Sequence, residues 1–231
     1  MGSEIDVIQS MYITDPTWIL LVPSGPVLVT ELSPFEPVSQ LMRTAIDGIL
    51  HELNPKTIRI IFSLRDTEYT AHTGSFRAWG GRETAVSTGN YLPELVARFL
   101  IGRYLERNPN VEVLTGSGLG DAEPHELIIY PIDGPAALTQ RAALGFNSKA
   151  AEFHDAMVKC ISHANNNATV EPTWLQSATK TTSEDDLSRA GVVNPSQWLE
   201  LFQYSYSSVQ LLVSDSTLGV GRYVALLQPC Y

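Results

Sequence analysis

The chain has 231 residues, of which 44% are hydrophobic and 17% charged, and this length and composition predict one domain with a large apolar core. Its 25 acidic residues outnumber its 15 Lys and Arg residues and give a net charge of −10, so we expect no nucleic-acid partner and no anionic membrane partner. The N-terminal stretch has no basic start and no long apolar run, which predicts neither a signal peptide nor a membrane span. The 2 cysteines form no disulfide framework or zinc pattern, and this favours a cytoplasmic location.

The first part of the chain alternates apolar strands with an amphipathic helix. The stretch LLVPSGPVLVTEL, residues 20–32, indicates a buried strand that opens into a Pro/Gly turn. Apolar residues then recur at three- and four-residue steps from Val38 to Leu53, and Pro37 suits the first turn of a helix that ends near Asn54. The β-branched run TIRIIFSL, residues 57–64, predicts the next buried strand.

The remainder of the chain repeats this alternation. A second amphipathic helix is predicted from Leu92 to Tyr104, and the runs VEVLTGSG and ELIIYPID predict two more strands. Helices are also expected at residues 147–163, 174–189 and 195–206, with Asn194 as the cap of the last. Two closing strands, at residues 208–216 and 221–229, predict a hairpin. The expected fold class is α/β, with a mostly parallel central sheet, helices on both faces and the terminal β-hairpin at an edge.

Polar residues occupy turns that follow the predicted strands. Ligands bind at the carboxyl ends of the strands in an open parallel sheet, so we expect these turns to form a pocket rim. The turns are residues 23–26, 63–69, 115–121 and 131–134. They contain Ser24, the charged cluster Arg65, Asp66 and Glu68, and Asp133. Such groups converge on a ligand as often as they solvate a loop.

Two of these turns resemble reactive motifs only superficially. Ser24 lacks the G-x-S-x-G elbow of a hydrolase nucleophile, so a hydrogen bond to its own turn is the favoured role. The stretch TGSGLGD, residues 115–121, lacks the glycine spacing and the lysine of a phosphate-binding loop. It predicts a flexible loop instead.

Of the 5 histidines, only His72 and His125 fall on loops near predicted strand ends. The other three lie within or at the end of predicted helices, where the helix dipole is a sufficient explanation: His51, His154 and His163. A site with two histidines and one carboxylate could use both loop histidines. The candidate acids for such a site are Asp66, Glu68, Asp121 and Asp133. The spacing follows no known ligand pattern, so this hypothesis is the less favoured one.

The stretch LVPSGPVLVTEL, residues 21–32, is similar to the "CPHPPLLVPEL"-type segment of the LigB-like family, the class III extradiol ring-cleavage dioxygenases and their actinobacterial relatives. Four further stretches agree with that family in order: GSFRAWGG, LPELVARFLIGRYL, DGPAALTQRAALGFNSKAAEFHDAMV and LGVGRYVALL. The resemblance covers about residues 18–228. It implies that residues 1–231 form a single LigB-like domain with three α/β/α layers, as in phosphorylase/hydrolase-like folds.

Ring-cleaving members of that family bind Fe(II) through two histidines and a carboxylate, or zinc through three histidines. The resemblance places Ser24 where the first ligand histidine would stand, and Arg65 closest to the place of the second. A hydroxyl is a poor neutral ligand, and a guanidinium stays cationic and repels a metal ion. The expected metal ligands are therefore missing.

Two functional hypotheses follow. The favoured one is a metal-free, non-catalytic LigB-like protein, without a cofactor, that binds a small anionic molecule or an interaction partner in a pocket lined by Ser24, Arg65 and Asp133. The alternative is a dioxygenase-like enzyme with a relocated Fe(II) or zinc site made of His72, His125 and Asp66. A homo-oligomer is also compatible, since ring-cleaving relatives are often multimers.

Overall fold

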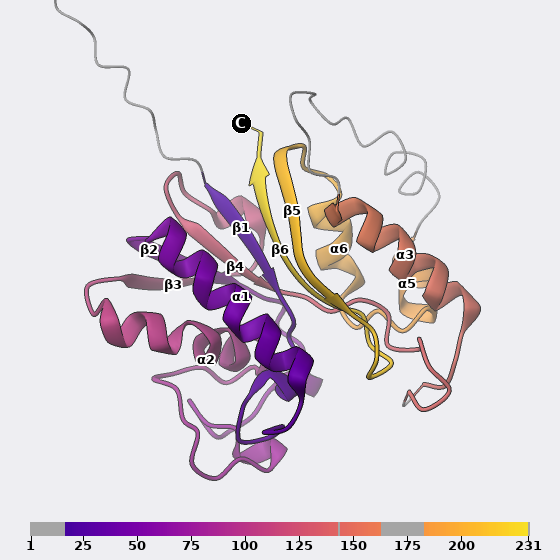
Figure 1. Ribbon diagram of the computed structural model, residues 1–231, viewed down its shortest axis with the longest axis horizontal. Coiled ribbons are helices and arrows are strands. Elements are labelled where there is room, and N and C mark those ends of the chain that lie inside the picture. Colours follow the sequence, from indigo (N-terminus) through magenta and orange to yellow (C-terminus); the bar gives the residue numbers. More distant parts are fainter. Residues whose placement is uncertain (1–16, 143, 163–182, 231) are drawn as a thin grey trace, which may run out of the picture.

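The computed structural model describes residues 17–142, 144–162 and 183–230, and within them the strands form one six-stranded sheet of order β3-β2-β4-β1-β6-β5 (Figure 1). The strands are β1 (Trp18–Val22), β2 (Thr57–Ile61), β3 (Glu112–Gly116), β4 (Leu127–Pro131), β5 (Tyr206–Asp215) and β6 (Arg222–Pro229). The helices are α1 (Pro37–Leu53), α2 (Leu92–Arg107), α3 (Ser148–Ser162), α5 (Glu184–Arg189) and α6 (Pro195–Leu201). The predicted α/β class is confirmed.

Strands β1 to β4 run parallel and form the larger part of the sheet. The segment between β1 and β2 contains α1, and the segment between β2 and β3 contains α2. Crossover helices of this kind return the chain to the starting end of the sheet, so that the next strand runs parallel to the one before it. β4 lies between β1 and β2, and all of its residues are buried. As a result β1, β2 and β4 end side by side, which is where a ligand site is expected.

The last two strands form an antiparallel hairpin at one edge of the sheet, as predicted. β6 also pairs with β1 in the antiparallel direction, so the whole sheet is mixed. The pairing of the edge strand β5 shifts register between Leu211 and Val213. A bulge of this kind disfavours pairing of an edge strand with another molecule.

The two faces of the sheet carry separate hydrophobic cores, because successive residues of a strand point to opposite faces. Leu20 and Val22 belong to the core under α1 and α2. Ile19 and Leu21 belong to the core under α3, α5 and α6. The molecule therefore has three layers, with α1 and α2 on one side of the sheet and the other helices on the opposite side (Figure 1).

Both ends of α1 lie where the sequence predicts them. The Glu36 carboxylate accepts a hydrogen bond of 2.5 Å from the backbone N–H of Ser39 and so caps the first turn. Pro37 occupies the first helical position, where an N–H group would have no helical partner. Asn54 ends the helix in the left-handed conformation, with a φ of 44°, and donates its N–H to the carbonyl of Leu50.

α6 is shorter than predicted. It ends at Leu201, whereas the sequence pattern continues to Tyr206. Tyr206 instead begins β5 and pairs with Pro229 of β6. Aromatic residues suit a strand as well as a helix, so the pairing with β6 decides the state of this segment.

Two other predicted helices fall partly outside the described residues. α3 agrees with the helix predicted at residues 147–163, except that His163 lies outside the described residues. Of the helix predicted at residues 174–189, residues 174–182 lie outside them as well. α5 covers the rest of that prediction, and Ser183 and Asp186 form a capping box at its start.

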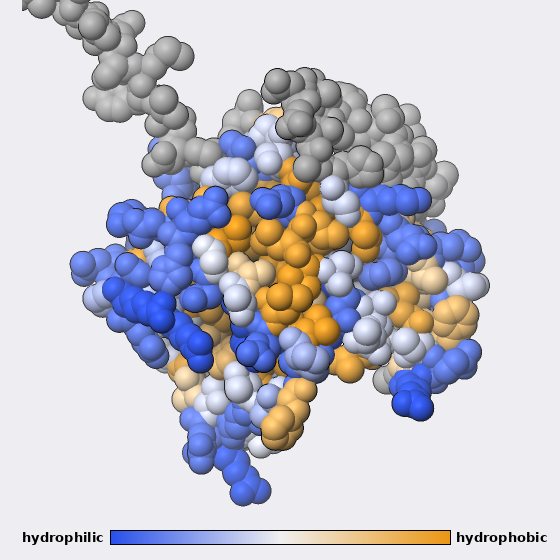
Figure 2. Space-filling view, in the orientation of Figure 1, coloured by the Kyte–Doolittle hydropathy of each residue, from blue (hydrophilic) through white to orange (hydrophobic). Residues whose placement is uncertain are grey.

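The hairpin is only partly covered on the face that it shares with α1. Figure 2 shows apolar side chains at the surface over β5 and β6, between the more polar surfaces of α1 and α3. Leu212 of β5 is partly buried and packs against the core on this face. This feature does not identify an occupant, so the homo-oligomer stays a prediction. No helix in the described ranges is both long and apolar enough to cross a membrane.

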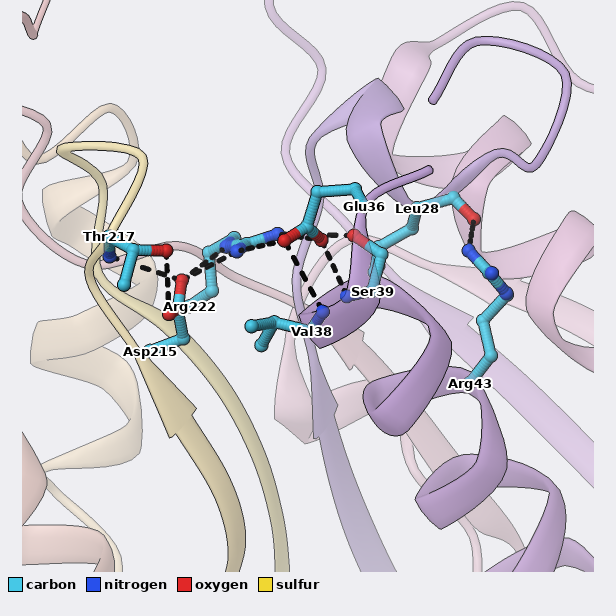
Figure 3. A network of polar contacts seen from close by, with 8 residues as sticks. All are labelled: Leu28, Glu36, Val38, Ser39, Arg43, Asp215, Thr217 and Arg222. Atoms are coloured by element: carbon cyan, nitrogen blue, oxygen red, sulfur yellow. Dashed lines mark hydrogen bonds and ion pairs between the residues drawn. The ribbon is translucent and has the colours of Figure 1, made fainter. Parts of the chain in front are cut away.

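A buried arginine joins the hairpin to α1. Arg222, the first residue of β6, is 2% exposed and lies between Glu36 and Asp215 (Figure 3). Its Nη1 donates to Glu36 and to the Ser39 hydroxyl, both at 3.1 Å, and its Nη2 donates to Asp215 at 2.5 Å. Thr217 donates to the other oxygen of Asp215 at 2.8 Å. One guanidinium thus connects the start of α1 with both strands of the hairpin.

This network depends on ionised carboxylates. Burial by itself would raise the pKa of Glu36, but the hydrogen bonds from Arg222 and Ser39 lower it from 4.5 to about 2. A carboxyl group with a depressed folded-state pKa contributes stability that is present above its unfolded pKa and is lost as the pH falls through its folded pKa. The contribution of Glu36 is therefore complete above about pH 4.5 and is lost toward pH 2.

We predict that Arg222→Met lowers the free energy of unfolding by about 3–5 kcal/mol, because it leaves buried carboxylates without their partner. Urea denaturation at neutral pH measures the change. The triple variant Arg222→Met/Glu36→Gln/Asp215→Asn should recover part of the loss, since it also removes the uncompensated charges. The control Arg107→Met, at an exposed position of α2, should change stability by no more than about 0.5 kcal/mol. An equal effect of the two single substitutions would contradict the importance of the buried network.

Candidate functional site

The parallel register of β1 and β4 brings two of the predicted site residues together. Val22 pairs with Pro131 at the ends of these strands, so Ser24 and Asp133 each follow two residues later. The Ser24 hydroxyl donates to Asp133 Oδ2 at 2.6 Å, and its backbone N–H lies 3.3 Å from both carboxylate oxygens. Ser24 is 7% exposed. The prediction that its hydroxyl bonds its own turn is therefore wrong, because the neighbouring carboxylate is a better acceptor.

The backbone around Asp133 is held by the opposite layer and by the hairpin. The Trp198 indole N–H of α6 donates to the carbonyl of Asp133 at 2.8 Å. The next residue, Gly134, donates its N–H to Gly221 at 2.7 Å. A Cβ atom at Gly134 would lie 2.4 Å from the Tyr223 hydroxyl, so the close approach requires glycine. These contacts fix the position of the Asp133 carboxylate.

Burial raises the pKa of Asp133. The hydrogen bonds from Ser24 and the positive charge of Arg222 act in the opposite direction, since both favour the ionised carboxylate. The buried arginine of the hairpin therefore also influences the site at the end of β4.

The loop after β2 supplies a second acid, and this one is buried. Asp66 and Glu68 belong to the same short 3-10 helix, in which Asp66 is exposed and Glu68 is 9% exposed. Glu68 Oε2 is buried and has no hydrogen-bond partner in the described part of the chain. Burial raises the pKa of Glu68, and the charge of Asp133 raises it further, while Arg65 and Asn194 act to lower it. A buried acid without a full set of partners is a candidate functional group.

Arg65 lies at the outer side of this acid pair. Its Nη1 donates to the carbonyl of Val193 and, at 3.3 Å, to Asn194 Oδ1. The Ser63 hydroxyl donates to the same Asn194 oxygen at 2.9 Å. Asn194 precedes α6 as predicted, but its side chain makes no capping hydrogen bond. It joins the loop after β2 to the start of α6 instead, because Ser63 and Arg65 compete for its oxygen.

We call Ser24, Arg65, Glu68, Asp133 and Asn194 the strand-end site. It contains all three residues predicted to line a pocket, and it adds Glu68 and Asn194. The sequence analysis placed Glu68 in a charged cluster and left open whether this cluster binds a ligand or only keeps the loop solvated. Only the path of the loop shows that Glu68 points inward while Asp66, two residues earlier, does not.

The residues of the alternative metal site are not brought together. His125 precedes the first residue of β4 and lines a cavity with Trp18 and Asn54, at the amino ends of the strands. His72 and Asp66 follow the carboxyl end of β2, and His72 is exposed. Among residues 17–142, 144–162 and 183–230, no group of three or more His, Cys, Asp or Glu side chains is arranged to hold a metal ion.

A tyrosine–histidine pair lies near Asp133. The sequence analysis did not predict this pair. His154 Nδ1 is 2.6 Å from the Tyr223 hydroxyl, and the two rings are stacked with centroids 5.5 Å apart. Burial lowers the pKa of His154, and burial together with the charge of Asp133 raises the pKa of Tyr223. His154 is therefore a packed residue of α3 with a specific partner, and its helix position alone does not explain it.

Comparison with known proteins does not assign a family to this chain. No model of a known protein family matches the sequence, and no curated protein matches it at a significant level.

The site combines a buried acid, Glu68, and a partly buried one, Asp133, with hydrogen-bond donors. When Glu68 is protonated it can donate a hydrogen bond, and when it is ionised it accepts one. Asp133 is already engaged with Ser24, and Arg65 supplies a positive charge. The arrangement can recognise a polar molecule that has hydroxyl or amino groups at one end and an anionic group at the other.

We predict that Glu68→Gln stabilises the fold by on the order of 1 kcal/mol at pH 8, because it removes a buried charge that has no full set of partners. The sign follows from the raised pKa of Glu68. An acid with a raised folded-state pKa destabilises the fold when it is ionised, and this cost disappears below its unfolded value, 4.5. The gain should therefore shrink as the pH falls toward 4.5.

Urea denaturation at several pH values measures this effect. The control Glu106→Gln, at an exposed position of α2, should change stability little and without the same dependence on pH. A Glu68→Gln protein that is less stable than the parent at every pH would show that Glu68 is a satisfied structural residue.

Proposed function

We propose that the protein binds a small polar organic molecule at the strand-end site and that it does so without a metal ion. The single observation that supports this is Glu68, a buried carboxyl group with an unpartnered Oε2 atom, whose pKa is raised further by the charge of Asp133. Natural proteins keep such destabilising groups mainly where a ligand or a reaction needs them. The site also lies at the carboxyl ends of parallel strands, where ligands of open α/β sheets bind.

The chemistry of the site favours a ligand with two different ends. Within the described part of the chain, the bonds that Arg65 makes use only its Nη1, so its Nε and Nη2 groups can bind a carboxylate or phosphate. Glu68 and Asp133 oppose a second negative charge and instead suit a hydroxyl or amino group. Small hydroxy acids and amino acids have both features, and they retain the anionic character that the sequence predicts.

We further propose that the chain is a LigB-like protein, on the sequence resemblance and on the three-layer architecture that agrees with it. The metal of the ring-cleaving enzymes does not fit the residues present. The Ser24 hydroxyl is engaged as a donor to Asp133, and Arg65 introduces a positive charge. These two residues therefore do not form the metal site of the ring-cleaving enzymes.

A cytoplasmic location belongs to the same proposal. Cys160 and Cys230 are both free thiols, which agrees with a reducing compartment. Burial raises the pKa of the Cys160 thiol, so this residue is inert in comparison with an exposed cysteine.

The test is a thermal-unfolding screen with malate, lactate and serine, which each carry a hydroxyl group and a carboxylate. A ligand at ten times its Kd stabilises the fold by about 1.4 kcal/mol, which raises the Tm of a chain of this size by about 3–5 °C. Glycerol has the hydroxyl groups without the acid, and propionate has the acid without the hydroxyl group. Neither compound should have this effect.

Variants locate the binding. Glu68→Gln and Arg65→Gln should each weaken binding at least about tenfold, since each removes one of the two recognition ends. Asp66→Asn changes an exposed acid on the same short helix and should bind like the parent. Failure of all hydroxy acids and amino acids would overturn the proposal. Tight binding of one equivalent of Fe(II) or zinc under anaerobic conditions would also overturn it, because the proposed binding needs no metal ion.

A further inference from the structure

A second polar concavity is the groove between α1 and α2. It has a volume of about 610 Å³. Its lining includes Arg43, Thr44 and Asp47 from α1, Phe99 and Arg103 from α2, and Pro34 from the loop that precedes α1. Residues four positions apart, such as Arg43 and Asp47 or Phe99 and Arg103, lie on the same face of a helix. The two helices therefore present these side chains to one another across the groove.

Two arginines face this groove without a carboxylate partner. Arg43 donates its Nη1 to the carbonyl of Leu28 at 2.9 Å (Figure 3). None of the ion pairs in the described ranges involves Arg43 or Arg103. Burial and the positive charge of Arg103 lower the pKa of Arg43, and Glu36 offsets this only in part. Two like charges held close together repel one another, and an anion between them would remove this repulsion.

The acid of the groove is directed to another partner. Asp47 Oδ1 lies 3.8 Å from His51 Nε2, on the next turn of α1. Its negative charge still weakens the attraction of the groove for an anion. Asp47 can therefore be used to test whether the ligand is an anion, because its removal should strengthen the binding of an anion.

The groove also has apolar lining residues. Phe99, Leu100 and Pro34 line it beside the polar Thr30 and Gln40. Side chains of this kind suit contact with the apolar part of an organic ligand, because aromatic rings contribute large contact areas to binding sites.

We propose that the groove between α1 and α2 binds a small organic oxyanion, a phosphate or carboxylate attached to an aromatic or apolar group. Arg43 and Arg103 bind the oxyanion, and the Thr44 hydroxyl lies within the same lining. Phe99, Leu100 and Pro34 contact the apolar part. This site is separate from the strand-end site and does not depend on its function.

Isothermal titration calorimetry with four probes tests the proposal. Phenyl phosphate and benzoate carry an oxyanion on a ring, phenol has the ring alone, and inorganic phosphate has the anion alone. At least one of the first two should bind with a Kd below about 1 mM, and phenol and inorganic phosphate should bind at least about tenfold more weakly. A preference between phenyl phosphate and benzoate identifies phosphate or carboxylate as the natural group. Equal binding of phenol, or no binding of either ring anion, would overturn the proposal.

Substitutions assign the site. Arg103→Gln removes a side chain that makes no hydrogen bond within the described residues, so its effect is separable from folding, and it should weaken binding at least about tenfold. Arg43→Gln should do the same. Arg107→Gln removes an equal charge one turn further along α2 and should leave the affinity within about twofold. Asp47→Asn should strengthen binding. Equal losses in the Arg103 and Arg107 variants, or weaker binding after Asp47→Asn, would contradict the site.

Discussion

The ion-pair network of Arg222 is the interaction on which the assembly of this fold depends most. The antiparallel hairpin is joined to the parallel strands by pairing along β1, and its turn is joined to the loop after β4 by the hydrogen bond between Gly134 and Gly221. Arg222 adds an attachment to the helix layer, because one buried guanidinium binds Asp215 of β5 and Glu36 at the first turn of α1. The same charge favours the ionised form of Asp133. A contact made for the fold thus also sets the electrostatics of the strand-end site.

The strand-end site follows from simple geometry in the parallel half of the sheet. β1, β2 and β4 end at one edge, so the residues that follow them meet without any long-range coincidence. The acids inside the site have fewer hydrogen-bond partners than the backbone that surrounds them. Glu68 is buried beside Asp133 and lacks a partner for one oxygen, while Trp198 and Tyr223 fix the surrounding backbone rigidly. A rigid frame around an unsatisfied acid is the arrangement that binding sites require, because the acid cannot relax toward solvent.

α1 connects the two proposed sites. Its first turn holds the Glu36 carboxylate that binds Arg222, and the next turns carry the arginine that faces α2. The charge of Glu36 also acts to raise the pKa of Arg43. The network and the groove are nevertheless physically separate: in Figure 3, Arg43 extends toward Leu28 and away from the contacts of Arg222.

The sequence by itself determined the order of the elements, because hydrophobic periodicity and local caps depend on neighbouring residues. Pro37 and Asn54 bound α1 correctly, and the predicted hairpin and parallel strands are present. Ser24, Arg65 and Asp133 were found because they follow strands. The partners of these residues were decided only by the tertiary structure. The Ser24–Asp133 bond joins residues more than a hundred positions apart, and the inward turn of Glu68 depends on the path of a loop. The end of α6 depends on the pairing of β5, and the facing of Arg43 and Arg103 depends on how two helices pack. These are long-range contacts, for which periodicity carries no signal.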